Sequence, residues 1–101
     1  MPRPFEMIFL VTYDIPSTRA GDRRRTKLAK HLLSRGLRVQ WSVFEIPLPP
    51  EKLPALCAEI AQIIVLEEDS VRLYPLCAAC ANRVEHIGVK AVIERDSFIV
   101  W

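Results

Sequence analysis

The sequence predicts a small α+β domain in which two helices pack on one face of a mostly antiparallel sheet. Three observations support this prediction: an apolar run at residues 5–13, two amphipathic segments near residues 22–35 and 51–65, and extended segments between and after them. Elements in this order form a two-layer sandwich around one core. At 101 residues, the chain is expected to be a single domain, 1–101.

The first strand and the first helix are predicted from the first third of the chain. Residues 5–13 are rich in Ile, Leu, Val and Phe, which is typical of a buried strand. Pro16 disfavours helix at the residue before it, so a turn is expected there. Asp22 is the expected N-cap of a helix that reaches about Arg35, and Gly36 is expected to stop it. The apolar stripe of this helix is Leu28, Ala29, Leu32 and Leu33.

The remaining elements fit a ferredoxin-like βαββαβ order if residues 37–48 form two strands. The apolar phase of residues 37–48 switches between Val43 and Phe44, which indicates a bulge or a break near Ser42. A second helix is expected at 51–65, with Pro54 in its first turn and an apolar stripe that includes Cys57 and Ala61. Residues 67–69 are expected to form a solvated acidic turn, 70–76 a strand, and 77–82 a short irregular or helical piece. Segments 84–87, 89–94 and 98–101 look strand-like, so the fold is expected to carry an extra C-terminal strand in a tail at 89–101.

Charge and cysteine usage restrict the function classes. The net charge is only +2, but most of the fourteen Lys and Arg residues fall between Arg3 and Arg38, so one face is expected to be basic. The three cysteines do not form a disulfide framework, which favours the cytoplasm. Cys77 and Cys80 have the spacing of zinc ligands but lack convincing partners, so buried or half-buried thiols are expected. No segment is long and apolar enough to predict a membrane span.

Asp14 lies at the end of the apolar strand, and arginines follow it at positions 19 and 23–25. A carboxylate held at the rim of a core beside guanidinium groups suits metal-assisted phosphate chemistry. The arginine run is expected at a helix N-terminus, where cations are disfavoured and a bound phosphate would relieve the repulsion. The alternatives are an Asx turn at Asp14 and an ordinary solvated helix face.

A single aspartate cannot hold a catalytic magnesium ion, because hard cations prefer several oxygen ligands. The second carboxylate is expected either from Asp22 or from Asp14 of a second chain across a two-fold axis. His31 is expected to be solvated or to contact phosphate. Tyr13, Trp41 and Phe44 are candidates for stacking on bases, although strand aromatics are more often part of the core.

Three motifs of the sequence together match the pattern of one known family. The first is Tyr13-Asp14-Ile15 at the end of the first strand, followed by an arginine-bearing helix. The second is the segment 36–45, which contains Gln40-Trp41-Ser42-Val43-Phe44. The third is the proline-led second helix followed by the segment 69–76. In these motifs the sequence resembles the CRISPR-associated Cas2 family, and the resemblance covers residues 7–88.

This resemblance implies a ferredoxin-like homodimer in which Asp14 of both protomers holds Mg²⁺ at the interface. It implies a magnesium-dependent nuclease of the spacer-acquisition machinery, acting on single-stranded RNA or double-stranded DNA. Accessory positions of the family fall on Tyr13, Arg25, Arg38 and Phe44. A further family arginine is replaced here by Lys27, which cannot make a bidentate contact. With the residues of the basic helix, the expected nucleic-acid-binding set is Tyr13, Arg19, Arg23, Arg25, Lys27, Arg38 and Phe44.

Two other functions remain open. In the first, the chain is a non-catalytic scaffold: its basic helix follows duplex DNA and its tail, 89–101, docks the CRISPR spacer integrase by adding a strand. Alternatively, residues 89–101 form the last strand of the chain's own sheet or of the dimer mate's sheet. In the second, the chain is an RNA-binding module, which would require aromatic side chains exposed on the sheet face.

Overall fold

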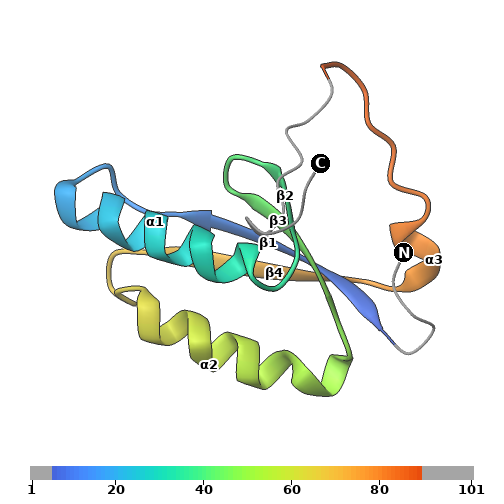
Figure 1. Ribbon diagram of the computed structural model, residues 1–101, viewed down its shortest axis with the longest axis horizontal. Coiled ribbons are helices and arrows are strands. Elements are labelled where there is room, and N and C mark those ends of the chain that lie inside the picture. Colours follow the sequence, from blue (N-terminus) through green and yellow to red (C-terminus); the bar gives the residue numbers. More distant parts are fainter. Residues whose placement is uncertain (1–5, 90–101) are drawn as a thin grey trace.

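The computed structural model describes residues 6–89 and contains one antiparallel four-stranded sheet (Figure 1). The strands are β1 (Met7–Asp14), β2 (Leu37–Gln40), β3 (Val43–Leu48) and β4 (Ser70–Leu76), in the order β2-β3-β1-β4. The helices are α1 (Arg19–Leu33), α2 (Leu53–Ile63) and the short α3 (Ala78–Ala81), with a 3-10 turn, η1 (Pro50–Lys52), before α2. This arrangement confirms the predicted ferredoxin-like α+β fold.

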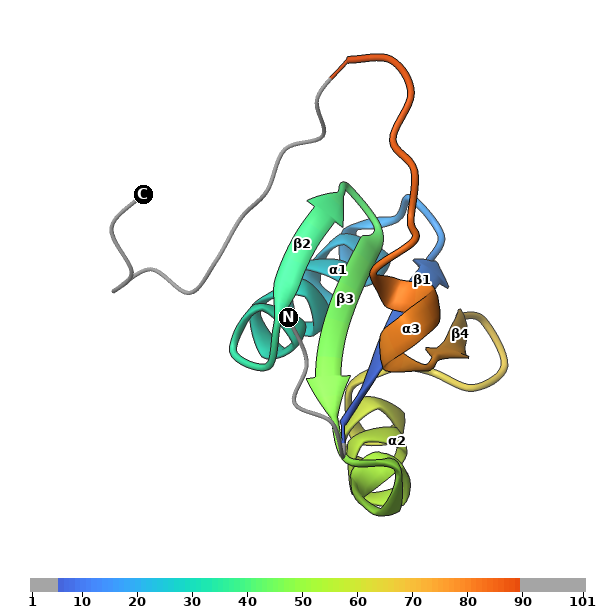
Figure 2. The same cartoon turned by 90° about the vertical axis from the view of Figure 1, so that its right-hand side faces the viewer.

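Helices α1 and α2 lie side by side on one face of the sheet, and the core fills the space between them and the strands (Figures 1 and 2). Alternate residues of the two central strands point into this core, as the period-two pattern of a half-buried strand requires. The buried apolar residues are Phe9, Val11, Tyr13, Ile15, Leu28, Ala29, Leu32, Phe44, Ile46, Leu48, Leu56 and Ile60.

Helix α1 begins one turn earlier than predicted. Thr18 is the N-cap, and its Oγ1 accepts a hydrogen bond of 2.9 Å from the Gly21 N–H. Asp22 is therefore inside the first turn, and the prediction that it caps the helix was wrong. Gly21 permits the earlier start, because a Cβ at this position would lie 2.0 Å from the Pro16 carbonyl oxygen. As a result the arginine run 23–25 lies beyond the first turn, and the argument from dipole repulsion does not apply to it.

The predicted break within residues 37–48 is confirmed. Strands β2 and β3 are joined by a turn at Trp41 and Ser42, and the register also shifts between Arg38 and Gln40. Helix α1 ends just before this hairpin, where the Gly36 N–H donates to the Leu32 carbonyl oxygen at 3.0 Å. Glycine is required at position 36 by a close approach, because a Cβ there would lie 2.2 Å from the Glu45 carbonyl oxygen on β3.

Three predictions in the second half of the chain were wrong. Cys57 and Ala61 are exposed rather than part of the α2 stripe, whose buried residues are Leu56 and Ile60. Asp69 is buried rather than solvated. Residues 84–87 form no strand; after α3 the chain leads away from the sheet (Figure 2).

The predicted strands at 89–94 and 98–101, and most of the predicted tail at 89–101, lie outside the described residues. Between residues 6 and 89, no helix has the length and apolar character that crossing a membrane requires.

Candidate functional site

Asp14 is the last residue of β1, and its side chain is exposed beside a pocket of about 430 Å³. The strand is held on both sides, by β3 and by β4, where Asp14 is paired with Ser70. Within residues 6–89, the Asp14 carboxylate has no hydrogen-bonded or charged partner. Other residues that line this pocket are Tyr13, Ser17, Arg25, Arg38 and Trp41.

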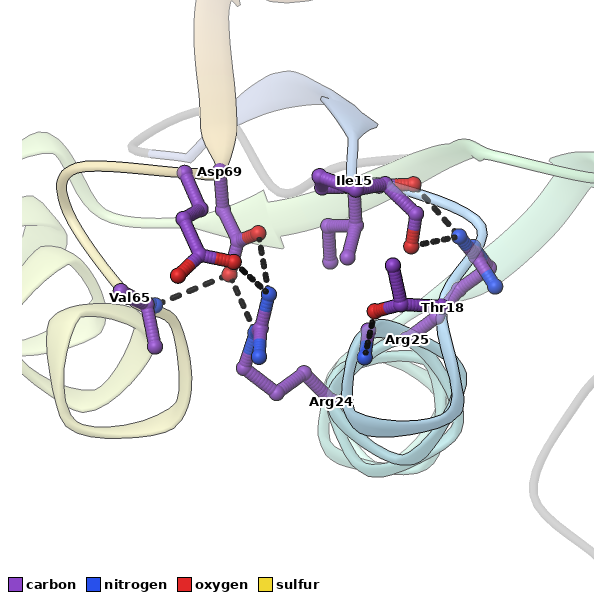
Figure 3. Close-up of polar contacts among 9 residues, drawn as sticks. Ile15, Thr18, Arg24, Arg25, Val65 and Asp69 are labelled. Atoms are coloured by element: carbon purple, nitrogen blue, oxygen red, sulfur yellow. Dashed lines mark hydrogen bonds and ion pairs between the residues drawn. The ribbon is translucent and has the colours of Figure 1, made fainter.

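Arg25 holds the loop that follows Asp14. Its guanidinium group donates to the main-chain oxygens of Ile15 and of Pro16, the latter at 3.1 Å (Figure 3). The same guanidinium also pairs with the Asp22 carboxylate at 2.6 Å. Arg25 was expected to bind a phosphate, but in this conformation these acceptors occupy its guanidinium. The contacts fix the direction in which the chain leaves β1 and therefore the position of Asp14.

Arg24 leaves α1 in another direction and reaches the loop before β4 (Figure 3). It donates to both carboxylate oxygens of Asp69, at 2.6 and 2.9 Å, and Asp69 also accepts from the Val65 N–H at 2.9 Å. The Arg24 guanidinium and the Val65 N–H hold the pKa of Asp69 below its usual range. The alternative of an ordinary solvated helix face does not hold for Arg24, because its side chain is only 14% exposed.

Tyr13, Phe44 and Arg38 form a layered support at the edge of the pocket. The Tyr13 and Phe44 rings are stacked with centroids 6.1 Å apart, and the Arg38 guanidinium lies 5.1 Å from the Phe44 centroid. Phe44 is completely buried and Tyr13 is 8% exposed. Because Phe44 is buried, its ring is not open for stacking on a base. The Tyr13 and Phe44 rings instead form a support on which the Arg38 guanidinium lies.

Of the three aromatic residues weighed between base stacking and the core, Trp41 is the exposed one. It lies in the turn between β2 and β3, and 81% of its surface is exposed. The break near Ser42 was the signal against a core position, because a turn residue does not continue the alternation of the strand before it.

A basic stripe runs along the exposed side of α1. Its residues recur at intervals of three or four, which places them on one helix face. They border a shallow groove that begins near Ser17, which also lines the Asp14 pocket. Among the described residues, none of these side chains has an acidic partner. The stripe consists of Arg19, Arg23, Lys27 and Lys30.

The described part of one chain does not contain a complete metal site. No group of three or more His, Cys, Asp or Glu side chains gathers between residues 6 and 89. Asp22 was a candidate second ligand, but it is engaged with Arg25. Asp14 is an exposed oxygen donor without a partner in these residues, so it fits one half of a magnesium site that a second carboxylate would complete.

His31 and the cysteines differ from their predicted surroundings. His31 Nε2 lies 2.9 Å from Glu59 on α2, and this contact lowers the pKa of Glu59. Cys57, Cys77 and Cys80 are exposed rather than half-buried. The Cys80 N–H donates to Cys77 Sγ at 3.4 Å, which lowers the pKa of the Cys77 thiol.

Comparison with known proteins agrees with this architecture. The profile of the family described as CRISPR associated protein Cas2 matches residues 7–84. The chain is 38% identical over 96 residues to a CRISPR-associated endonuclease Cas2 of Halalkalibacterium halodurans, covering 94% of this chain and 100% of that protein. It is 41% identical over 88 residues to a CRISPR-associated endoribonuclease Cas2 of Rhodospirillum rubrum, covering 86% and 93% of the two chains.

Solved structures agree with the sequence comparison. The crystal structure of Streptococcus pyogenes Cas2 at pH 6.5 superposes with a TM-score of 0.73 and 40% identity, covering 81% of this chain and all of that one. A hypothetical protein from Thermus thermophilus superposes with a TM-score of 0.71 and 38% identity, covering 88% and 99% of the two chains. The chain therefore belongs to the CRISPR-associated Cas2 family.

Proposed function

We propose that this chain is a magnesium-dependent nuclease of the CRISPR spacer-acquisition machinery and that it works as a homodimer. The observation that carries the proposal is Asp14, an exposed carboxylate on a strand held from both sides and without a partner in the described residues. The relatives named as Cas2 endonucleases and endoribonucleases support the same reaction class.

The division of roles follows from the geometry of one chain. Asp14 from each protomer would hold Mg²⁺, which when bound activates water and stabilises negative charge on a phosphate. Arg25 fixes the loop after Asp14 through the Ile15 and Pro16 oxygens and so positions the carboxylate. Arg38 lies at the rim of the same pocket, where a guanidinium attracts the phosphates that flank the reacting one.

Replacing Asp14 by Asn tests this proposal. The variant keeps the size of the side chain and removes the charge, so the expected result is a folded dimer without magnesium-dependent cleavage. Cleavage of labelled single-stranded RNA, single-stranded DNA and duplex DNA would be followed with magnesium and with EDTA. Glu67→Gln is the matched control, because Glu67 is an exposed carboxylate in the loop before β4. Wild-type cleavage by the Asp14→Asn protein would refute the nuclease assignment to this site.

A second candidate function, a non-catalytic scaffold for duplex DNA and the spacer integrase, is favoured by the basic stripe. Four cations on one face of α1, without acidic partners among residues 6–89, suit the phosphate backbone of a duplex, which is recognised by charge and not by sequence. Deleting residues 89–101 and measuring integrase binding and dimerisation separately tests whether the tail docks the integrase or belongs to the dimer.

The scaffold function predicts a salt dependence that the catalytic function does not require. Lys27→Ala removes one phosphate contact, so the slope of log affinity against log salt should fall by about 0.9 for duplex DNA. Lys52→Ala is the control, since Lys52 is an exposed lysine in η1, outside the basic stripe. Equal slopes for the two variants would contradict a role of the stripe in DNA binding.

A further inference from the structure

Trp41 is held in a defined position although its ring is exposed. Its main-chain oxygen accepts from Arg38 Nε at 3.1 Å and from the Tyr13 hydroxyl at 3.4 Å. Tyr13 is in turn buried against Phe44. The turn that carries the indole is thus tied to the core, while 81% of the residue remains in contact with solvent.

The surroundings of the ring are those of a stacking platform. The Arg38 guanidinium lies 5.5 Å from the Trp41 centroid, and the high exposure leaves much of the indole open to a ligand. Core packing does not explain why a tryptophan occupies this position, because its exposed ring contributes little to the core. A flat ring with a cation beside it suits a nucleobase with its attached phosphate, since base–aromatic stacking and phosphate pairing then act together.

The location connects this platform to the candidate site. Trp41 lines the pocket that also contains Asp14, and it lines a second pocket of about 430 Å³ that extends to His86 and Val89. A strand that places one phosphate in the Asp14 pocket therefore passes Trp41, which lines the same pocket.

We propose that Trp41 stacks on an unpaired nucleobase next to the phosphate that Mg²⁺ at Asp14 would hold, so that the site takes single-stranded nucleic acid or an unpaired end. This inference rests on the proposed nucleic-acid function and specifies its substrate. A base inside a duplex is already stacked on its neighbours and does not present a free face to the indole. The expected ligand is thus a strand with at least one unpaired base.

The pair of Arg72 and Tyr74 serves as a control for the pair of Arg38 and Trp41. Arg72 lies 5.2 Å from the centroid of Tyr74 on β4, so the same type of cation–aromatic contact occurs there. Tyr74 is only 40% exposed, and neither residue lines the Asp14 pocket. Replacing Tyr74 should therefore leave binding of single strands unchanged.

The experiment measures binding by the fluorescence of Trp41. Trp101 is the second tryptophan of the sequence, so a Trp101→Phe background leaves Trp41 as the only tryptophan, whose emission is then followed selectively. Adding Asp14→Asn to this background excludes cleavage during the titration. The probes are a 15-nucleotide oligothymidine, the corresponding oligouridine, and a blunt duplex of the same length.

Both single strands should quench Trp41 emission in a saturable way, whereas the blunt duplex should not. Without the indole, the Trp41→Ala variant, followed by fluorescence anisotropy of labelled strands, should bind them about 5–150-fold more weakly. Its duplex affinity should be unchanged, and Tyr74→Ala should behave as the parent protein does.

Equal single-strand affinity of the Trp41→Ala and parent proteins, or binding without any change in emission, would overturn the assignment of Trp41. These results would leave the nuclease proposal standing, because that proposal is judged by cleavage in the protein with an intact Asp14. Absence of binding to all three probes, both in the Asp14→Asn background and in the protein with an intact Asp14, would instead reject the nucleic-acid function and this inference with it.

Discussion

The buried ion pair between Arg24 and Asp69 gives a prediction that can be worked out from the structure. The Asp69 side chain is completely buried, and it accepts hydrogen bonds from Arg24 and from the Val65 N–H. Replacing Asp69 by Ala leaves the guanidinium without its main partner. Breaking one side of a buried pair costs about 3–5 kcal/mol, and the lower end is expected because Glu68 remains 3.4 Å from Arg24.

The assay is chemical and thermal unfolding followed by circular dichroism. A loss of about 3 kcal/mol corresponds to a fall of about 12–24 °C in the unfolding temperature of a domain this small. Glu68→Ala is the control, because the Glu68 side chain is 57% exposed and an exposed ion pair contributes about 0–1 kcal/mol. If Asp69→Ala were no less stable than Glu68→Ala, the structural role given to this pair would be refuted.

The pair also predicts how stability depends on pH. Arg24 lowers the pKa of Asp69 in the folded state, so the stabilisation is present above the unfolded value of about 3.9 and is lost as the pH falls through the folded value. The stability difference between the wild-type protein and Asp69→Asn should therefore be constant near neutral pH and shrink below about pH 4. A difference that grows in acid would contradict the assignment.

Three further predictions concern packing and thiol chemistry. Gly36→Ala should destabilise the fold by about 1–3 kcal/mol in urea unfolding, because the new Cβ would lie 2.2 Å from the Glu45 carbonyl oxygen; unchanged stability would contradict this close approach. Leu28→Ala should cost about 2–5 kcal/mol in the same measurement, since Leu28 is completely buried, and a loss below that range would mean that the core collapses around the gap. Cys77 should react with iodoacetamide faster than Cys80, because hydrogen bonding from the Cys80 N–H lowers the Cys77 pKa while the Cys77 thiol raises that of Cys80; peptide mapping would show the reverse order if this were wrong.

Regular alternation and helical stripes were sufficient to predict the sheet and the two main helices. The alternation of Val71 and Leu73 with polar neighbours predicted β4, and the stripe around Leu28 and Leu32 predicted α1. These patterns work because each face of an element meets either the core or water along its whole length. The start of α1 was missed because Thr18 and Asp22 are both good N-caps. Thr18 is the cap because the Pro16 carbonyl oxygen approaches Gly21 closely, and this contact cannot be read from the sequence.

The candidate site was predicted in part. Asp14 lies where the strand pattern placed it, at the exposed rim of the core. The sequence did not reveal that Arg24 would be buried against Asp69, because its partner lies 45 residues away within an acidic run that resembles a solvated turn. Trp41 was left open between base stacking and the core, and its exposed place in the turn could not be read from the sequence alone. The contact of Arg24 with Asp69 and the exposure of Trp41 depend on how the fold arranges its loops. The local sequence pattern does not contain this information.

The pairing of Asp14 across a dimer is the central claim, and a crystal structure of the dimer grown with magnesium tests it most directly. The predicted result is one ion bound by a carboxylate oxygen of Asp14 from each protomer, at about 2.1 Å from both. An Asp14 pair too far apart to share one ion and its waters, or a magnesium ion bound elsewhere, would contradict the claim.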